Sequence, residues 1–148
     1  MTCKQIEIWI AKHYGVTKNL IVPNVSYGMG LHECDILILS KSGYATEIEI
    51  KVSRADLLKD SQKTHLHMHQ KISRLYFAMP ESMQKDISLV PDRAGVILVR
   101  SDGRLIFNRL PKENLRYKFS CEEMYKLARL GNLRYWFARI KNESIVAV

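Results

Sequence analysis

Two carboxylate-rich segments, close together in the chain, are the residues best suited to metal chemistry. The first contains Asp35, and the second contains Glu47 and Glu49 followed by Lys51. The intervening residues 41–43 end in glycine, as expected for a three-residue hairpin loop whose last residue takes a positive φ. We therefore predict a β-hairpin in which the two segments pair.

Pairing of Ser40 with Tyr44 across this loop would set the register of the hairpin. Asp35 then lies opposite Glu49. Period-two alternation puts five polar side chains on one face of the sheet: Glu33, Asp35, Glu47, Glu49 and Lys51. In this register Glu33 lies opposite Lys51. Burial of the isoleucines on the other face would prevent a one-residue slip.

Two directly opposed carboxylates repel each other unless a cation lies between them. Lys51 supplies one positive charge, and a divalent metal would supply the rest. Oxygen ligands favour Mg²⁺ or Mn²⁺ over zinc. Alternation of Glu and Lys with Ile is also typical of an ordinary half-exposed strand pair, and this is the plain alternative. The opposed carboxylates and their flanking segments favour the metal site.

The order of these segments resembles the signature of the PD-(D/E)XK nuclease superfamily. Asp35 followed across a hairpin by Glu49-Ile50-Lys51 matches its core motif, although Cys34 replaces the usual proline. Within the superfamily, the chain from about residue 32 to 109 resembles the MmcB-like DNA-repair proteins of bacteria. The matching motifs are residues 33–35, 49–56, 75–80 and 95–99. The resemblance covers a little over half of the chain and leaves out residues 111–148.

The resemblance implies a metal-dependent DNA endonuclease that hydrolyses phosphodiester bonds in repair or recombination. It assigns Mg²⁺ or Mn²⁺ to the carboxylates of Asp35 and Glu49 and the carbonyl of Ile50. Lys51 would orient or activate the attacking water. Glu7, on the first predicted helix, is a tentative further ligand, and its alternative is a solvated acid on an amphipathic helix. Glu47 would bind a second metal or pair with a nearby lysine.

Further candidates for contact with DNA follow the lysine motif. The superfamily places a polar helix there, which implies backbone contacts by Lys63, Gln70 and Lys71. Three histidines lie in the same region: His65, His67 and His69. His65 and His69 would share a helix face at the spacing of a metal pair, but no third ligand completes a zinc site nearby. A solvated or phosphate-contacting cluster is the favoured interpretation.

The formal net charge of +8 indicates an acidic partner, and DNA is the one we expect. Residues 1–103 hold 13 Lys and Arg against 11 Asp and Glu, whereas residues 104–148 hold 10 against 4. Arg134 and Arg139 flank aromatic residues in this basic segment, a pattern suited to phosphate contact and base stacking. The alternative is that the aromatic residues belong to the core. The basic segment also makes a non-catalytic DNA-binding module the alternative function. A junction resolvase is a variant of the endonuclease function and would need a homodimer.

Helices are predicted at both ends of the chain, around a central run of strands. Predicted helices cover residues 3–14, 54–60, 61–72, 81–87 and about 120–141, the last with a break near 131–132. Predicted strands cover residues 20–22, 25–27, 34–40, 44–52, 74–79, 94–100 and 105–110. We expect an α/β fold over residues 1–148, a single nuclease-like domain whose restriction-endonuclease-like mixed central β-sheet is flanked by helices.

Cysteine usage and hydropathy bear on the compartment. The three cysteines are widely spaced, with no CxxC pair, which argues against a disulfide framework. No stretch approaches the roughly 20 apolar residues of a membrane span, and no signal peptide is recognisable. We expect inert thiols and a cytoplasmic protein that does not bind membranes.

Overall fold

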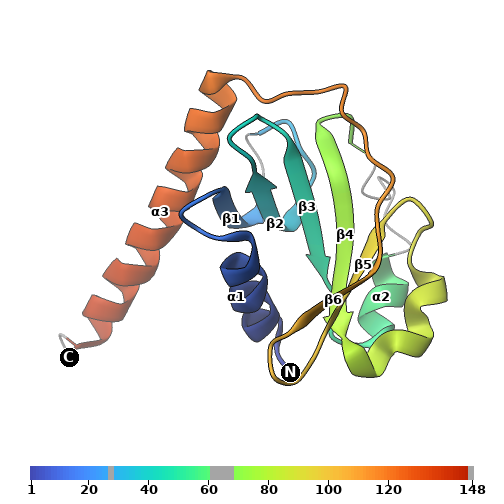
Figure 1. Cartoon of the computed structure of the whole chain (residues 1–148). Helices are drawn as coiled ribbons and strands as arrows, with labels where there is room; N and C mark the ends of the chain where they lie inside the picture. The colour runs from blue at the N-terminus through green and yellow to red at the C-terminus, as the bar shows by residue number, and fades with distance from the viewer. Residues whose placement is uncertain (27–28, 61–68, 147–148) are drawn as a thin grey trace.

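The computed structural model describes residues 1–26, 29–60 and 69–146 and contains an open six-stranded sheet with helices on both faces (Figure 1). The strands follow one another across the sheet in chain order: β1 (Leu20–Val25), β2 (Cys34–Leu39), β3 (Ala45–Ile50), β4 (Ile72–Pro80), β5 (Gly95–Val99) and β6 (Leu105–Arg109). The pairs β3–β4 and β4–β5 are parallel, and the other three are antiparallel. The sheet is mixed and flanked by helices, which confirms the predicted α/β class.

One face of the sheet is covered by α1 (Cys3–Tyr14). Ile6 and Ile10 of this helix are fully buried against the isoleucines that β2 and β3 direct to that face. Thr2 caps the start of the helix: its side chain accepts a hydrogen bond from the Gln5 amide, and the Thr2 amide donates to the Gln5 side chain, which together form a capping box. The amphipathic pattern of α1 therefore places its polar side at the edge of the site described below.

The opposite face is covered by α2 (Arg54–Asp60), the 3₁₀ helix η1 (Glu81–Leu89) and α3 (Cys121–Val146). Leu57 of α2 and Met83 of η1 pack over β4 and β5, whereas Leu127 of α3 packs over β1 and β2. Two separate apolar clusters result on this face. None of the helices in the described residues is long and apolar enough to cross a membrane.

The β2–β3 hairpin has the register predicted from its loop. Leu37 pairs with Glu47 and Leu39 pairs with Ala45, and the Ser40 amide donates to the Tyr44 carbonyl at 3.0 Å. Gly43 takes φ +89°, as the loop requires. The paired ladder ends at Ile36 and Ile48, so the predicted pairing of Glu33 with Lys51 does not form. Asp35 and Glu49 also lie beyond the ladder, and hydrogen bonds from backbone amides to their carboxylates join the two strands there.

Two element predictions differ from the structure. Most of the predicted helix 61–72 lies outside the described residues, and its described end is not helical, because residues 69–71 form a turn before β4 begins at Ile72. The strand β4 is buried along almost its whole length, as expected for a strand with parallel neighbours on both sides, and it begins two residues before the predicted strand 74–79. The predicted break near Gly131 is also absent, because α3 runs through it. An added Cβ at Gly131 would lie 3.3 Å from Val22, so this glycine allows close packing on β1 rather than ending the helix.

Candidate active site

A polar cleft of about 380 Å³ lies where β2 begins and β3 ends. Side chains from both strands, from α1 and from α2 line it: Cys3, Glu7, Asn24, Glu33, Asp35, Glu49, Ile50, Lys51 and Asp56. The cleft thus brings together Asp35, Glu49, Ile50 and Lys51 with the tentative candidate Glu7. These are the residues that the sequence assigned to the metal, apart from Glu47.

Asp35 and Glu49 are held by reciprocal contacts across the hairpin. The Ile50 amide donates to Asp35 Oδ2 at 2.7 Å, and the Asp35 amide donates to Glu49 Oε1 at 3.4 Å. Each carboxylate therefore accepts a hydrogen bond from the backbone of the partner strand. These bonds orient both side chains toward the same end of the hairpin and satisfy part of their acceptor capacity.

Lys51 lies between two buried carboxylates. Its Nζ is 3.0 Å from Glu49 Oε2 and 2.9 Å from Asp60 Oδ1. Burial lowers the pKa of Lys51, but the charge of Glu49 and hydrogen bonds from Nζ to Asp60 and Glu49 outweigh it and raise the pKa above its ordinary value. Lys51 is therefore a cation at neutral pH, able to donate hydrogen bonds and offset negative charge but not to accept a proton.

Asp60 was not among the candidates from the sequence. It is the last residue of α2 and is 4% exposed, on the same helix face as the buried Leu57. The sequence pattern that could have identified it is an acid three residues after Leu57, which lies on the apolar side of a short helix and is therefore expected to be buried. Its ion pair with Lys51 joins α2 to the end of β3.

Glu7 enters the cleft from α1. Burial raises the pKa of its carboxyl, Lys4 lowers it, and the charge of Asp35 raises it further, for a net increase above the ordinary value. The influence of Asp35 places the two carboxylates in the same electrostatic environment. Cys3, one helical turn earlier, also lines the cleft.

The donor set fits a magnesium-type ion. No group of three His, Cys, Asp or Glu residues within the described ranges is arranged to enclose a metal. Mg²⁺ does not require such a cage, because it keeps several waters and binds one or two protein carboxylates together with substrate phosphates. Asp35 and Glu49, with Glu7 and the Ile50 carbonyl at the same cleft, supply the hard oxygen atoms that such a site needs.

Glu47 lies elsewhere. It is 0% exposed, it does not line the cleft, and its Oε1 lies 2.7 Å from His32 Nε2. The His32 imidazole is therefore a partner of Glu47. Alternation along β3 places Glu47 on the same face of the sheet as Glu49. The cleft, however, lies at the end of the strand, beyond Glu47.

The DNA-contact candidates are scattered. Lys63, His65 and His67 lie outside the described residues. Gln70 is exposed, whereas the Lys71 Nζ lies 2.7 Å from Glu123 at the start of α3. Arg134 donates to the carbonyl of Asn24 and lies 3.5 Å from Ser26 Oγ, so it fastens α3 to the end of β1.

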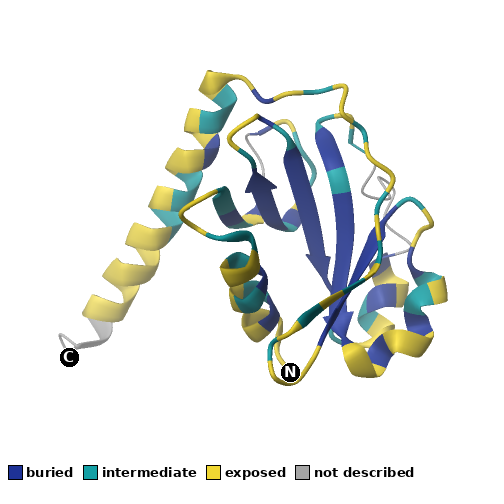
Figure 2. Cartoon of the chain, viewed as in Figure 1, coloured by how far each residue is buried: buried dark blue, intermediate teal, exposed yellow. Residues whose placement is uncertain are grey.

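The second half of α3 is a basic and aromatic surface. Arg139 is exposed, with its guanidinium 3.3 Å from the Tyr135 hydroxyl. Trp136 and Phe137 are 50% and 65% exposed, and Figure 2 shows this end of the helix almost entirely exposed. The alternative that these aromatic residues belong to the core is therefore wrong for residues 135–137, whereas Phe119 is buried.

The three cysteines form no disulfide. Cys34 is buried, but Cys3 and Cys121 are exposed, so burial accounts for only one of the three thiols. The prediction of no disulfide framework is confirmed.

Comparison with known proteins shows the fold but no activity. No family model and no curated protein matches the chain. A solved structure of a protein of unknown function from Silicibacter pomeroyi is similar, with a TM-score of 0.65 and 19% sequence identity over 91% of this chain and 86% of that one. At this identity the similarity concerns the arrangement of helices and strands alone.

Proposed function

We propose that this protein is a metal-dependent DNA endonuclease whose active site is the cleft at the end of the β2–β3 hairpin. The observation that carries the proposal is the joint placement of Asp35, Glu49 and Lys51 at one polar cleft, with Glu7 beside them. Two opposed carboxylates next to a permanent cation suit binding of Mg²⁺ or Mn²⁺ and of the phosphodiester. The proposal includes a cytoplasmic location, as expected from the cysteine usage and hydropathy of the sequence.

Each side chain has a distinct task in this proposal. Asp35 and Glu49 hold the metal, with the Ile50 carbonyl and Glu7 as further oxygen donors. The bound metal would polarise a phosphoryl oxygen and lower the pKa of water. Lys51 donates hydrogen bonds to the attacking water or to the phosphate and offsets the charge that develops there. Its raised pKa favours this role as a hydrogen-bond donor at neutral pH.

The test compares cleavage and metal binding in the same preparations. Linear, nicked, flapped and four-way-junction DNA are incubated with Mg²⁺, Mn²⁺ or Ca²⁺. We expect cleavage of at least one substrate with Mg²⁺ or Mn²⁺, and a loss of at least 100-fold in Asp35→Asn and Glu49→Gln. Calorimetry with Mn²⁺ should show binding to the wild type that both variants weaken.

The control variant is Asp102→Asn, because Asp102 is an exposed acid on the β5–β6 hairpin. It should retain full cleavage. If no substrate is cut and Mn²⁺ does not bind, the proposed active site is wrong. The nearly isosteric substitutions are preferred to alanine, since Glu49 and Lys51 are buried and their truncation would disturb the fold.

A non-catalytic DNA-binding module is the second candidate. The favouring observation is the exposed surface of α3, which carries Arg139 beside Trp136 and Phe137. This function predicts binding with a steep salt dependence that Asp35→Asn leaves unchanged, and no cleavage with any metal.

A further inference from the structure

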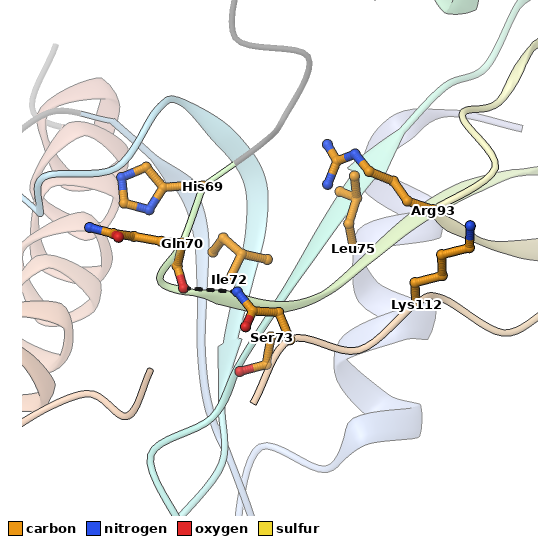
Figure 3. Close-up of a pocket in the computed structure, with 8 residues that line it drawn as sticks. His69, Gln70, Ile72, Ser73, Leu75, Arg93 and Lys112 are labelled. Carbon is orange, nitrogen blue, oxygen red and sulfur yellow. Dashed lines mark hydrogen bonds between the residues drawn. The ribbon is translucent and has the colours of Figure 1, made fainter. Parts of the chain in front are cut away.

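A second pocket, of about 350 Å³, opens beside the beginning of β4 and shares no residue with the carboxylate cleft. Three parts of the chain form it: residues 69–75, Arg93, and residues 112–114. Figure 3 shows Arg93 and Lys112 on one side, His69 and Gln70 on the other, and Ile72 and Leu75 between them. The pocket therefore has a cationic wall, a polar wall and an apolar floor.

Backbone hydrogen bonds hold the walls in place. The Lys112 amide donates to the Arg93 carbonyl at 2.8 Å, and the Asn114 amide donates to the Ser73 carbonyl at 2.9 Å. The Asn114 side chain also donates to the Gln70 carbonyl at 3.2 Å, the bond drawn in Figure 3. Because all three segments are tied together, the pocket is a formed feature of the fold.

The cationic wall suits a phosphate group. Lys112 is exposed, and its ammonium makes no ion pair with any residue in the described part of the chain. Arg93 is half-buried; burial lowers its pKa, and the charge of Glu47 raises it, yet a guanidinium stays charged at neutral pH. Arginine and lysine together are the side chains that bind phosphate oxygens in proteins.

The other wall is neutral and able to form hydrogen bonds. Burial, followed by the charges of His32 and Lys71, lowers the pKa of His69, which keeps the imidazole neutral at pH 7. Gln70 presents an exposed side-chain amide, and the Ser73 hydroxyl is buried without a hydrogen bond to any described group. Amides recognise base edges, and apolar side chains such as Ile72 and Leu75 pack against a base or sugar.

The volume of the pocket indicates an anion larger than inorganic phosphate. A volume of about 350 Å³ lies in the range of small-molecule sites and exceeds what an inorganic phosphate fills. From these features we propose that the pocket binds a nucleoside monophosphate group, with Arg93 and Lys112 on the phosphate and Gln70, Ile72 and Leu75 beside the nucleoside. The group could belong to a free nucleotide or to the 5′-phosphorylated end of a DNA strand.

The second source deepens the proposed function and rests on it. Glu49 is adjacent to Phe77 in the sheet, and Ser73 precedes Phe77 by four residues, or roughly 13 Å along the strand. A DNA end held in this pocket would then lie a short distance from the carboxylate cleft. Glu47, two residues before Glu49 on β3, is near enough to Arg93 for its charge to raise the pKa of that residue.

Binding is measured in EDTA, where no metal-dependent cleavage takes place. The probes are a labelled single-stranded 12-mer with a 5′-phosphate, the same 12-mer with a 5′-hydroxyl, and dAMP. We expect the phosphate to improve binding by about tenfold. Lys112→Gln and Arg93→Gln should remove most of this gain. Lys85→Gln, at an exposed lysine of η1 outside both pockets, should retain it.

The outcomes separate the two sources. Preference for the phosphorylated 12-mer without dAMP binding identifies a DNA end, and dAMP binding that Lys112→Gln weakens identifies a free nucleotide. Equal binding of both 12-mers without dAMP binding, or binding that neither variant changes, overturns the proposal. Circular dichroism verifies that Arg93→Gln is folded, and Lys112→Gln tests the exposed position independently. Since no metal is present, this result does not depend on whether the cleft cuts DNA.

Discussion

Lys51 is the residue on which the charge balance of the cleft depends. It is the shared partner of Glu49 and Asp60, and all three side chains are nearly inaccessible to water. Removing one member of a buried ion pair costs more than the pair contributes, because the remaining charge keeps its desolvation penalty. Lys51 therefore has a structural task that is separable from its proposed role toward phosphate.

We predict that Lys51→Met lowers the free energy of unfolding by about 3 kcal/mol at pH 7. The raised pKa means that the lysine contribution is complete below its ordinary value of 10.5 and is lost as the pH rises beyond it. Urea unfolding at pH 7 measures the change. Lys85→Met, at an exposed lysine, is the control and should change stability by less than about 0.5 kcal/mol. Equal stability of the two variants would contradict the role given to Lys51.

At the scale of elements, one acidic residue joins α3 to the turn before β4. Glu123 Oε1 accepts from Lys71 at 2.7 Å and from the Tyr117 hydroxyl at 2.6 Å, while Oε2 accepts from the Ser120 amide. Burial raises the pKa of Glu123, but the hydrogen bonds from Lys71, Tyr117 and Ser120 outweigh it and hold the pKa at about 2. Glu123, which also forms a capping box with Ser120, thus makes a tertiary contact as well.

We expect Glu123→Gln to lower stability by about 2 kcal/mol at pH 7, because glutamine keeps the capping box but not the charge. The lowered pKa makes this contribution present above the ordinary pKa of 4.5 and lost as the pH falls toward 2. Urea unfolding at pH 7, 5 and 3 should show the wild type approaching the variant at acidic pH. Glu122→Gln, next in sequence and exposed, is the matched control. A difference that does not vary with pH would contradict this interpretation.

Over the whole molecule, the basic excess and the carboxylates occupy different places. The acids of the body gather at the cleft, whereas α3 extends along one side of the sheet and carries exposed arginines and aromatic residues away from the core (Figures 1 and 2). Arg134 is used to fasten the helix, which leaves Arg139 as the better candidate for contact with phosphate.

We predict that Arg139→Gln reduces the slope of log K against log salt by about 1 for binding to a DNA duplex in Ca²⁺. Lys85→Gln should leave the slope unchanged. Fluorescence anisotropy at several salt concentrations gives the slopes. If Arg139→Gln behaves like the control, α3 does not contact the DNA backbone.

Much of the hairpin could be derived from the sequence, because its determinants are local. A glycine at the end of a three-residue loop and strict alternation were enough to set the register of the paired residues and to bury the isoleucines. Long-range packing decided the rest. Gly131 suggested a break in the helix, yet close packing against Val22 accounts for this glycine within a continuous helix. A turn at Gln70 lies where the end of another helix was predicted.

The sequence by itself determined the order of the elements, the register of the hairpin and the class of donor atoms at its end, since these depend on alternation, capping and turn chemistry. Only the tertiary structure decided which acids meet. Asp60 reaches Lys51 through α2, Glu7 reaches the cleft through α1, and Glu47 turns to His32 instead. These contacts depend on how the helices pack across the sheet, and the spacing of residues along the chain does not specify that packing.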